Sequence, residues 1–206
     1  MAYVESAVRR PQLIAAARTA LSRDGVTRTS LRAVAAEAGV PLGTLQHVFP
    51  TKELLLRAVI EDVVDQIAEV IKTSAELEQG LAHALRQGIT TFWTTLVSSH
   101  WGLQVMQYEL TMYALRTPGQ EGLARWQHER YASVIAEWCQ AAARRAGESS
   151  AVPYGQLARV ILAGTDGLVL QHVCDPNEAR SRENLDTLID MVIALTGVRQ
   201  RNSGTA

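Results

Sequence analysis

The spacing of the apolar residues constrains this chain more than any other feature of its sequence. Apolar side chains recur at steps of three and four residues through almost every segment, and the two-residue alternation of a half-buried strand is absent. Leu13, Ile14, Ala17 and Leu21 are a typical run. Because steps of three and four return to the same side of an α-helix, the pattern predicts an all-α fold.

Glycine, proline and short polar residues divide this pattern into about nine predicted helices. Asp24-Gly25 and Gly39 can end helices, while Ser30 and Thr51 can cap the N-termini of the next ones. A short helix is expected between Ser30 and Gly39. The other expected helices cover residues 9–23, 42–48, 51–71, 78–98, 101–116, 119–146, 152–175 and 181–196.

The composition is that of an ordinary globular chain. Of its 206 residues, 47% are hydrophobic and 20% are charged, which is enough apolar surface for a sizeable core. We find no apolar run of the roughly 18 to 20 residues that a membrane span needs, and no signal-peptide core in residues 1–10. The two cysteines are too few for a disulfide framework. We therefore expect a cytoplasmic protein with no membrane partner.

The charges are unevenly distributed along the chain. Residues 1–57 contain eight bases and four acids, whereas the remainder contains 12 bases and 17 acids. A basic segment attached to a larger acidic one suggests that only the N-terminal part binds a polyanion.

The residue types that support catalysis or metal binding lack the necessary spacing. His172 and Cys174 would lie on different faces of a helix, and His83, His100 and His128 form no pair at the i, i+4 spacing. A phosphate-binding glycine loop and a nucleophile elbow are also missing. We therefore expect no catalytic residue, no metal and no cofactor, and hence no enzyme.

Two short predicted helices flank Ala38-Gly39-Val40, the proportions of a helix-turn-helix. Glycine suits the sharp turn because it adopts positive φ without a steric penalty. The spacing of Ala35, Gly39, Gly43, Phe49, Lys52 and Leu55 within the string TSLRAVAAEAGVPLGTLQHVFPTKELL is more specific.

This string closely resembles the DNA-binding segment of the tetracycline-repressor (TetR) family of bacterial regulators, and the match extends over residues 10–60. A softer likeness is the stretch from Ala163 to Gln171, which is similar to the penultimate helix of many members. The resemblance implies an all-helical homodimer. It would have a helix-turn-helix DNA-binding domain over residues 1–50 and a helical domain over residues 51–206 that binds a small ligand and dimerises.

The second helix of the motif is expected to contact DNA. The family usually has tyrosine where Gln46 stands; the glutamine can form paired hydrogen bonds with adenine or remain solvated. His47 fills a DNA-facing position of the family or is structural, and Lys52 fills the position of a phosphate-contacting lysine or is solvated. Short hydroxyls and Arg32 suit phosphate oxygens, and Arg32 also suits guanine. The expected DNA-binding residues are Ser30, Arg32, Leu42, Gly43, Thr44, Gln46, His47, Thr51 and Lys52.

The acidic remainder of the chain contains all four tryptophans and most of the methionines. A cavity between helices lined by such side chains suits an apolar ligand, although the same spacing is also typical of an ordinary core. The predicted lining is Trp93, Trp101, Met106, Glu109, Tyr113 and Trp126, with Asp166 as a further candidate.

The last predicted helix has one apolar stripe, which can pack on its own domain or form part of a dimer interface. Glycines in the preceding predicted helix would let a second helix approach closely. We expect a four-helix interface made by the last two helices of two subunits, with Gly164, Gly167, Leu185, Leu188, Ile189, Val192 and Leu195.

Together these observations predict a dimeric DNA-binding transcriptional regulator. The resemblance favours a repressor that an apolar or aromatic small molecule releases from a near-palindromic operator. The alternative is a helical interaction or ligand-binding module without operator-specific DNA binding.

Overall fold

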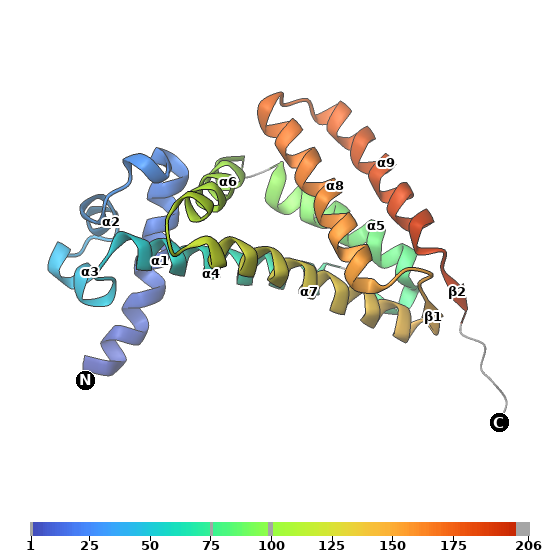
Figure 1. Cartoon of the computed structure of the whole chain (residues 1–206), viewed down its shortest axis with the longest axis horizontal. Coiled ribbons are helices and arrows are strands. Elements are labelled where there is room, and N and C mark those ends of the chain that lie inside the picture. The colour runs from blue at the N-terminus through green and yellow to red at the C-terminus, as the bar shows by residue number, and fades with distance from the viewer. Residues whose placement is uncertain (1, 75, 99–100, 201–206) are drawn as a thin grey trace. The chain divides into compact units, whose positions relative to one another are not determined.

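The computed structural model describes residues 2–74, 76–98 and 101–200, and the side chains of 9–74, 76–98, 102–199 (Figure 1). These residues form nine α-helices, a 3₁₀ turn, a π-helical segment and one pair of two-residue strands. The all-α prediction is confirmed. The helices are α1 Ala2–Arg28, α2 Leu31–Glu37, α3 Leu42–Val48, α4 Lys52–Thr73, α5 Leu81–Phe92, α6 Trp101–Arg116, α7 Glu121–Arg145, α8 Tyr154–Cys174 and α9 Glu178–Thr196.

The observed helices follow the predicted ones closely. The bounds of α3 and α6 are the same as predicted, because proline and glycine mark their ends. The largest differences are in α1, which begins earlier, and in the predicted 78–98 helix. That helix is divided into the turn Leu77–Gln79, α5 and the π-helical segment Trp93–Val97.

The chain divides into two compact units. The first unit is Met1–Gln66 with Gly102–Gln127, and the second unit is Ile67–Trp101 with His128–Ala206. The first unit therefore contains α6 and the beginning of α4 and α7 in addition to α1 to α3. The domain boundary at residue 50, expected from the resemblance, is a different division and stays a prediction.

In the first unit, α1 packs against α2 and α3. The helices meet through fully buried side chains, including Leu13 and Ala17 of α1, Val34 of α2, and Leu45 of α3 with Phe49 just after it. Burying an aliphatic or aromatic side chain of this kind contributes about 1.5 to 3 kcal/mol. This core fixes the orientation of the two short helices, which have too few residues to be stable alone.

In the second unit, α9 packs along α8 and also contacts α5. Strands β1 (Glu148–Ser149) and β2 (Arg199–Gln200) pair antiparallel. Helix α8 is the only helix of the described residues that is long and apolar enough to cross a membrane, a criterion that soluble core helices also meet.

Candidate nucleic-acid interface

Helices α2 and α3 form the predicted helix-turn-helix. Ser30 caps α2, since its Oγ accepts a hydrogen bond from the backbone N–H of Ala33 at 3.2 Å. Gly39 has φ of +66° in the turn, where the N–H of Val40 donates to the carbonyl of Ala35 at 3.0 Å. The left-handed backbone at Gly39 reverses the chain within three residues, so that α3 can follow α2 directly.

Helix α3 has one buried and one exposed side. Leu45 and Phe49 are 0% and 1% exposed and anchor the helix in the first unit. Gly43, Gln46 and His47 are exposed on the other side. The predicted base-contacting residues therefore project from the unit, where a DNA groove can reach them. Leu42 and Thr44 are half-buried, while Arg32 on α2 and Thr51 after α3 are exposed.

Two of the hydroxyls predicted to bind phosphate also serve as helix caps. The Oγ of Ser30 caps α2, and the Oγ1 of Thr51 accepts from the backbone N–H of Leu54 at 3.3 Å at the start of α4. The Ser30 hydroxyl acts as an acceptor in its cap, so its own O–H remains able to donate to a phosphate oxygen. The Thr51 hydroxyl also hydrogen-bonds to the carboxylate of Glu53, whose pKa is lowered by a backbone hydrogen bond and by this one.

The predicted phosphate lysine makes a structural contact. Its Nζ donates a hydrogen bond to the backbone carbonyl of Val26 at 2.6 Å, and partial burial lowers the pKa of the Lys52 ammonium. An ammonium has three N–H donors, so this bond leaves two for a phosphate. Lys52 therefore links the start of α4 to the end of α1, and its contact with DNA stays a prediction.

The backbone of Val26 is held from a second side by α6. Its N–H donates to Oε2 of Glu109 at 2.7 Å, across 83 positions of sequence. Glu109 was predicted to line a ligand pocket, but here its carboxylate satisfies the end of α1. Both backbone groups of Val26 are thus bonded to charged side chains, one from α4 and one from α6.

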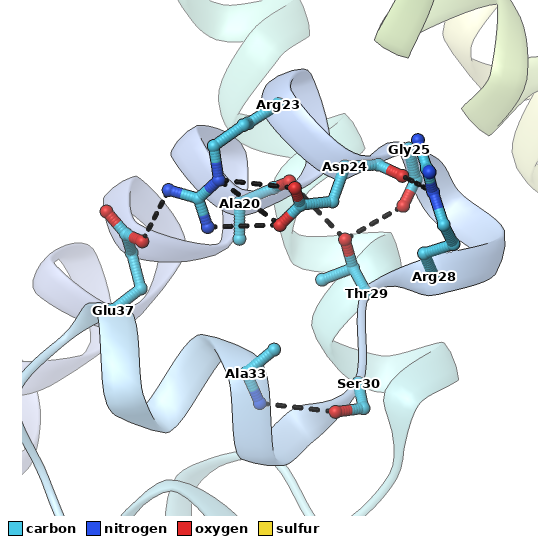
Figure 2. A network of polar contacts seen from close by, with 9 residues as sticks. All are labelled: Ala20, Arg23, Asp24, Gly25, Arg28, Thr29, Ser30, Ala33 and Glu37. Atoms are coloured by element: carbon cyan, nitrogen blue, oxygen red, sulfur yellow. Dashed lines mark hydrogen bonds and ion pairs between the residues drawn. The ribbon is translucent and has the colours of Figure 1, made fainter.

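A polar network joins the end of α1 to α2 (Figure 2). Gly25 has φ of +79°, and its carbonyl accepts from the hydroxyl of Thr29 at 2.8 Å. The guanidinium of Arg23 bonds to Asp24 at 3.0 Å and to Glu37 at 2.9 Å, and the hydrogen bond from Arg23 lowers the pKa of Asp24. Exposed ion pairs of this kind stabilise little, so their main effect is on geometry.

Two other predicted pocket residues also lie on α6 in the first unit. The hydroxyl of Ser22 lies 3.4 Å from Sδ of Met106, which is 1% exposed, and the hydroxyl of Tyr113 lies 3.5 Å from Oε1 of Glu53. These contacts are with α1 and α4. Sequence reasoning missed this role because nothing local distinguishes a side chain that faces a neighbouring helix from one that faces a cavity.

The remaining predicted pocket residues are divided between the units. Trp126 is 38% exposed in the first unit, whereas Trp93 is buried in the second unit, where its ring centroid lies 5.5 Å from that of His172 in an edge-to-face arrangement. Asp166 is exposed on α8, yet desolvation raises the pKa of its carboxyl. The side chain of Trp101 lies outside the described residues.

The predicted dimer residues also separate into two groups. Leu185, Ile189 and Val192 are buried within their own chain, at 3%, 0% and 1% exposure, so one side of α9 covers the second unit's own core. Gly164 has the same role, because a Cβ there would lie 2.5 Å from Cδ1 of Leu188. The role of these residues in a dimer interface stays a prediction.

The other side of α8 and α9 exposes apolar residues among charged ones such as Arg159 and Asp166. Gly167 has nothing within 4 Å of a Cβ position, and Leu195 is 37% exposed. Three exposed residues absent from the prediction extend this face: Val160 at 39%, Leu170 at 51% and Met191 at 65%.

Within the side chains that the structure describes, no group of three or more His, Cys, Asp or Glu residues is placed to hold a metal ion.

Two family models match the chain. Residues 13–59 match the model of bacterial regulatory proteins of the tetR family, and residues 60–195 match the tetracyclin repressor-like C-terminal domain. The chain belongs to the TetR family. Its function therefore lies among transcriptional regulators.

Individual relatives agree with this assignment. The nicotine-responsive transcriptional repressor HdnoR of Paenarthrobacter nicotinovorans is 28% identical over 190 residues, covering 92% of this chain and 96% of HdnoR. The regulator BetI of Escherichia coli is 35% identical over 95 residues, which are 45% of this chain and 49% of BetI.

Solved structures show the same TetR fold. A transcriptional regulator from Rhodococcus has a TM-score of 0.72 at 21% identity, covering 91% of this chain and 95% of its own. The multidrug binding protein EbrR complexed with ethidium has a TM-score of 0.65 at 27% identity, covering 87% and 98%.

Proposed function

We propose that this TetR-family protein is a homodimeric repressor that binds a near-palindromic operator through α3 and is released by a small aromatic molecule. The observation that carries the proposal is the exposed side of α3, with Gly43, Gln46 and His47 outward above buried Leu45 and Phe49. A recognition helix needs this arrangement, since its base-contacting side chains must project from a rigid core.

A single α3 is too short for specific recognition of an extended site. Two helices related by a two-fold axis read two half-sites about 34 to 36 Å apart, one turn of DNA. The exposed apolar face of α8 and α9 supports this dimer. A second copy would cover Val160, Leu170, Met191 and Leu195, which otherwise remain in water.

The effector is proposed to be an aromatic nitrogen compound. Support comes from the name of HdnoR, which is nicotine-responsive, and from the ethidium and imidazole complexes of EbrR. In the second unit, Trp93 supplies an aromatic ring and Asp166 a carboxylate whose pKa is raised by desolvation. Although Asp166 is exposed, its partly desolvated carboxylate would gain from a bound cation.

Release is proposed to pass through α4 and α6, which meet at Val26. A shift of either helix pulls on a hydrogen bond to this peptide and turns the helix-turn-helix, so that both copies of α3 no longer fit the DNA together. Met106, Glu109 and Tyr113 then act in this connection rather than as the pocket wall.

The test is selection of bound duplexes from a random pool, followed by ligand release measured by fluorescence anisotropy. We expect a two-fold symmetric consensus, affinity that falls steeply with salt, and release by nicotine or ethidium. Failure of the full-length protein to enrich any sequence would contradict operator binding and favour the alternative, a helical interaction or ligand-binding module.

Location follows from this function. A regulator of transcription in bacteria works where the chromosome is, so we propose that the protein is cytoplasmic.

A further inference from the structure

The structure distinguishes the basic residues of the first unit by their partners. Arg18 pairs with Asp62 at 2.9 Å, and Arg23 pairs with both Asp24 and Glu37. These guanidiniums are neutralised within the protein, so they add little to the field that a polyanion meets. The basic excess of the sequence must therefore act through other residues.

Arg10 is one of those other residues. It is exposed near the start of α1, and no carboxylate among the described residues lies within ion-pair distance of it. Its contact is with an aromatic ring: Cζ of Arg10 lies 4.8 Å from the ring centroid of Phe49, which is 1% exposed. The positive charge is thus positioned but not compensated.

This contact places the charge next to the recognition helix. Phe49 is the C-terminal cap of α3, and the neighbouring Gln12 donates from Nε2 to the carbonyl of Ala38 in the turn of the motif at 3.4 Å. The segment of α1 that contains Arg10 and Gln12 therefore lies beside the helix-turn-helix. Gln46 and His47, exposed on α3, lie within one turn of Phe49 in sequence.

A guanidinium held over an aromatic ring keeps its N–H donors available to a further partner. The contact with Phe49 reduces the number of conformations that Arg10 must give up on binding, and the planar guanidinium matches two phosphate oxygens at once. An exposed cation–π contact is worth about 0.5 to 1 kcal/mol. This small gain in folding stability does not by itself explain why an unpaired positive charge lies beside the recognition helix.

We propose that Arg10 contacts a DNA phosphate next to the groove that α3 enters, with Phe49 as the platform that positions it. This inference rests on the proposed operator binding and adds a contact that the sequence pattern did not indicate. A phosphate contact contributes equally to operator and unrelated DNA, because the backbone is the same in both.

The experiment measures the affinity of the full-length protein for a selected operator duplex and for a random-sequence duplex from 50 to 300 mM salt. Arg10→Ala is compared with wild type, with Arg10→Lys, and with Arg144→Ala as a matched control. Arg144 is exposed in the last turn of α7, in the second unit, with no ion pair among the described residues. Thermal unfolding of each variant reports any loss of stability.

We expect Arg10→Ala to weaken binding to both duplexes by about tenfold and to reduce the slope of log K against log[salt] by about one. Arg10→Lys should retain the slope, because the charge remains, with weaker binding than wild type. Arg144→Ala should match wild type.

Two results would overturn the inference. An unchanged salt slope in Arg10→Ala would make the stack purely structural, and a loss confined to the operator duplex would make Arg10 a base-reading residue. If the wild-type protein bound neither duplex, the proposed operator binding itself would be wrong. If the wild type bound both duplexes and Arg10→Ala bound them equally well, only the Arg10 contact would be wrong.

Discussion

Replacing Gly43 by alanine should separate the stability of this protein from its DNA binding. Gly43 is the second residue of α3 and has a helical rather than a positive φ. A Cβ built on it meets nothing within 4 Å. Alanine therefore fits without strain. Because glycine forms helices less readily than alanine, Gly43→Ala should raise the free energy of unfolding by up to about 1 kcal/mol. For a chain of this size that is a rise of about 2 to 4 °C in Tm.

On DNA the effect should have the opposite sign. Open space beside Gly43 in the free protein is space that the DNA backbone can occupy, and a methyl group there would push it away. Overpacking by one methyl in a close-packed contact costs about 1 to 3 kcal/mol. Since about 1.4 kcal/mol corresponds to tenfold, we expect operator affinity to fall by about 5-fold to 150-fold.

The chain offers a matched control in Gly122. It is also the second residue of its helix, α7, it is exposed, and its Cβ position is equally open. Gly122→Ala should raise Tm similarly and leave operator binding unchanged. Titration of a labelled operator by fluorescence anisotropy, with calorimetry of the free proteins, measures both quantities. Wild-type affinity in Gly43→Ala would show that DNA does not approach α3 here.

Three other changes test further parts of the structure. Lys52→Met should lower Tm, because the Val26 carbonyl loses a bond to a charged group worth about 1 to 3 kcal/mol. It should also reduce the salt slope by about one, and a lower Tm with an unchanged slope would assign Lys52 to structure alone. Leu170→Glu with Met191→Glu should yield a folded monomer in sedimentation experiments, and a persistent dimer would place the interface elsewhere. Asp166→Asn should raise Tm at pH 7, where the desolvated carboxylate destabilises the wild type; the difference should shrink as the pH falls through the raised pKa and the wild-type group is protonated. A difference that grew toward low pH would contradict that cause.

The helices were predictable because their signals are local. Gly39 and Pro50 mark the ends of the short helices, and the three- and four-residue steps of Leu13, Ala17 and Leu21 give the buried face of α1. Each of these signals lies within a few residues of the structure it determines. The helix-turn-helix could therefore be located from sequence together with its exposed residues.

The partners of apolar stripes were not predictable in the same way. Periodicity shows that Leu185, Ile189 and Val192 share one face of α9, but it does not say whether that face meets its own chain or another copy. The structure assigns it to the chain's own core. Another face of α9, which contains Met191, is the exposed one. Sequence reasoning missed this face because Met191 follows Asp190 and is not part of a continuous apolar stripe.

Long-range polar contacts have even less signal in a single sequence. Glu109 is 83 positions from Val26, and Lys52 is 26 positions from it. An aromatic-rich helix containing one glutamate suggested a pocket with an orienting group. In the structure that glutamate bonds to a backbone N–H that helix α1 leaves unsatisfied near Gly25, a need that becomes visible only when the turn is folded.

The two bonds at Val26 also limit how strongly an effector can act through them. A hydrogen bond to a charged group is worth about 1.5 to 3 kcal/mol, less where solvent screens it. Losing either the Glu109 or the Lys52 bond in the released state therefore supplies a coupling free energy of about 1 to 3 kcal/mol, which corresponds to a change of about 5-fold to 150-fold in operator affinity. Both bonds come from helices that share residues with the second unit: α4 extends past Ile67 into it, and the first residue of α6, Trp101, is the last residue of its first segment. If an effector releases the operator as proposed, linkage requires that it bind the operator complex more weakly than the free protein by that same factor.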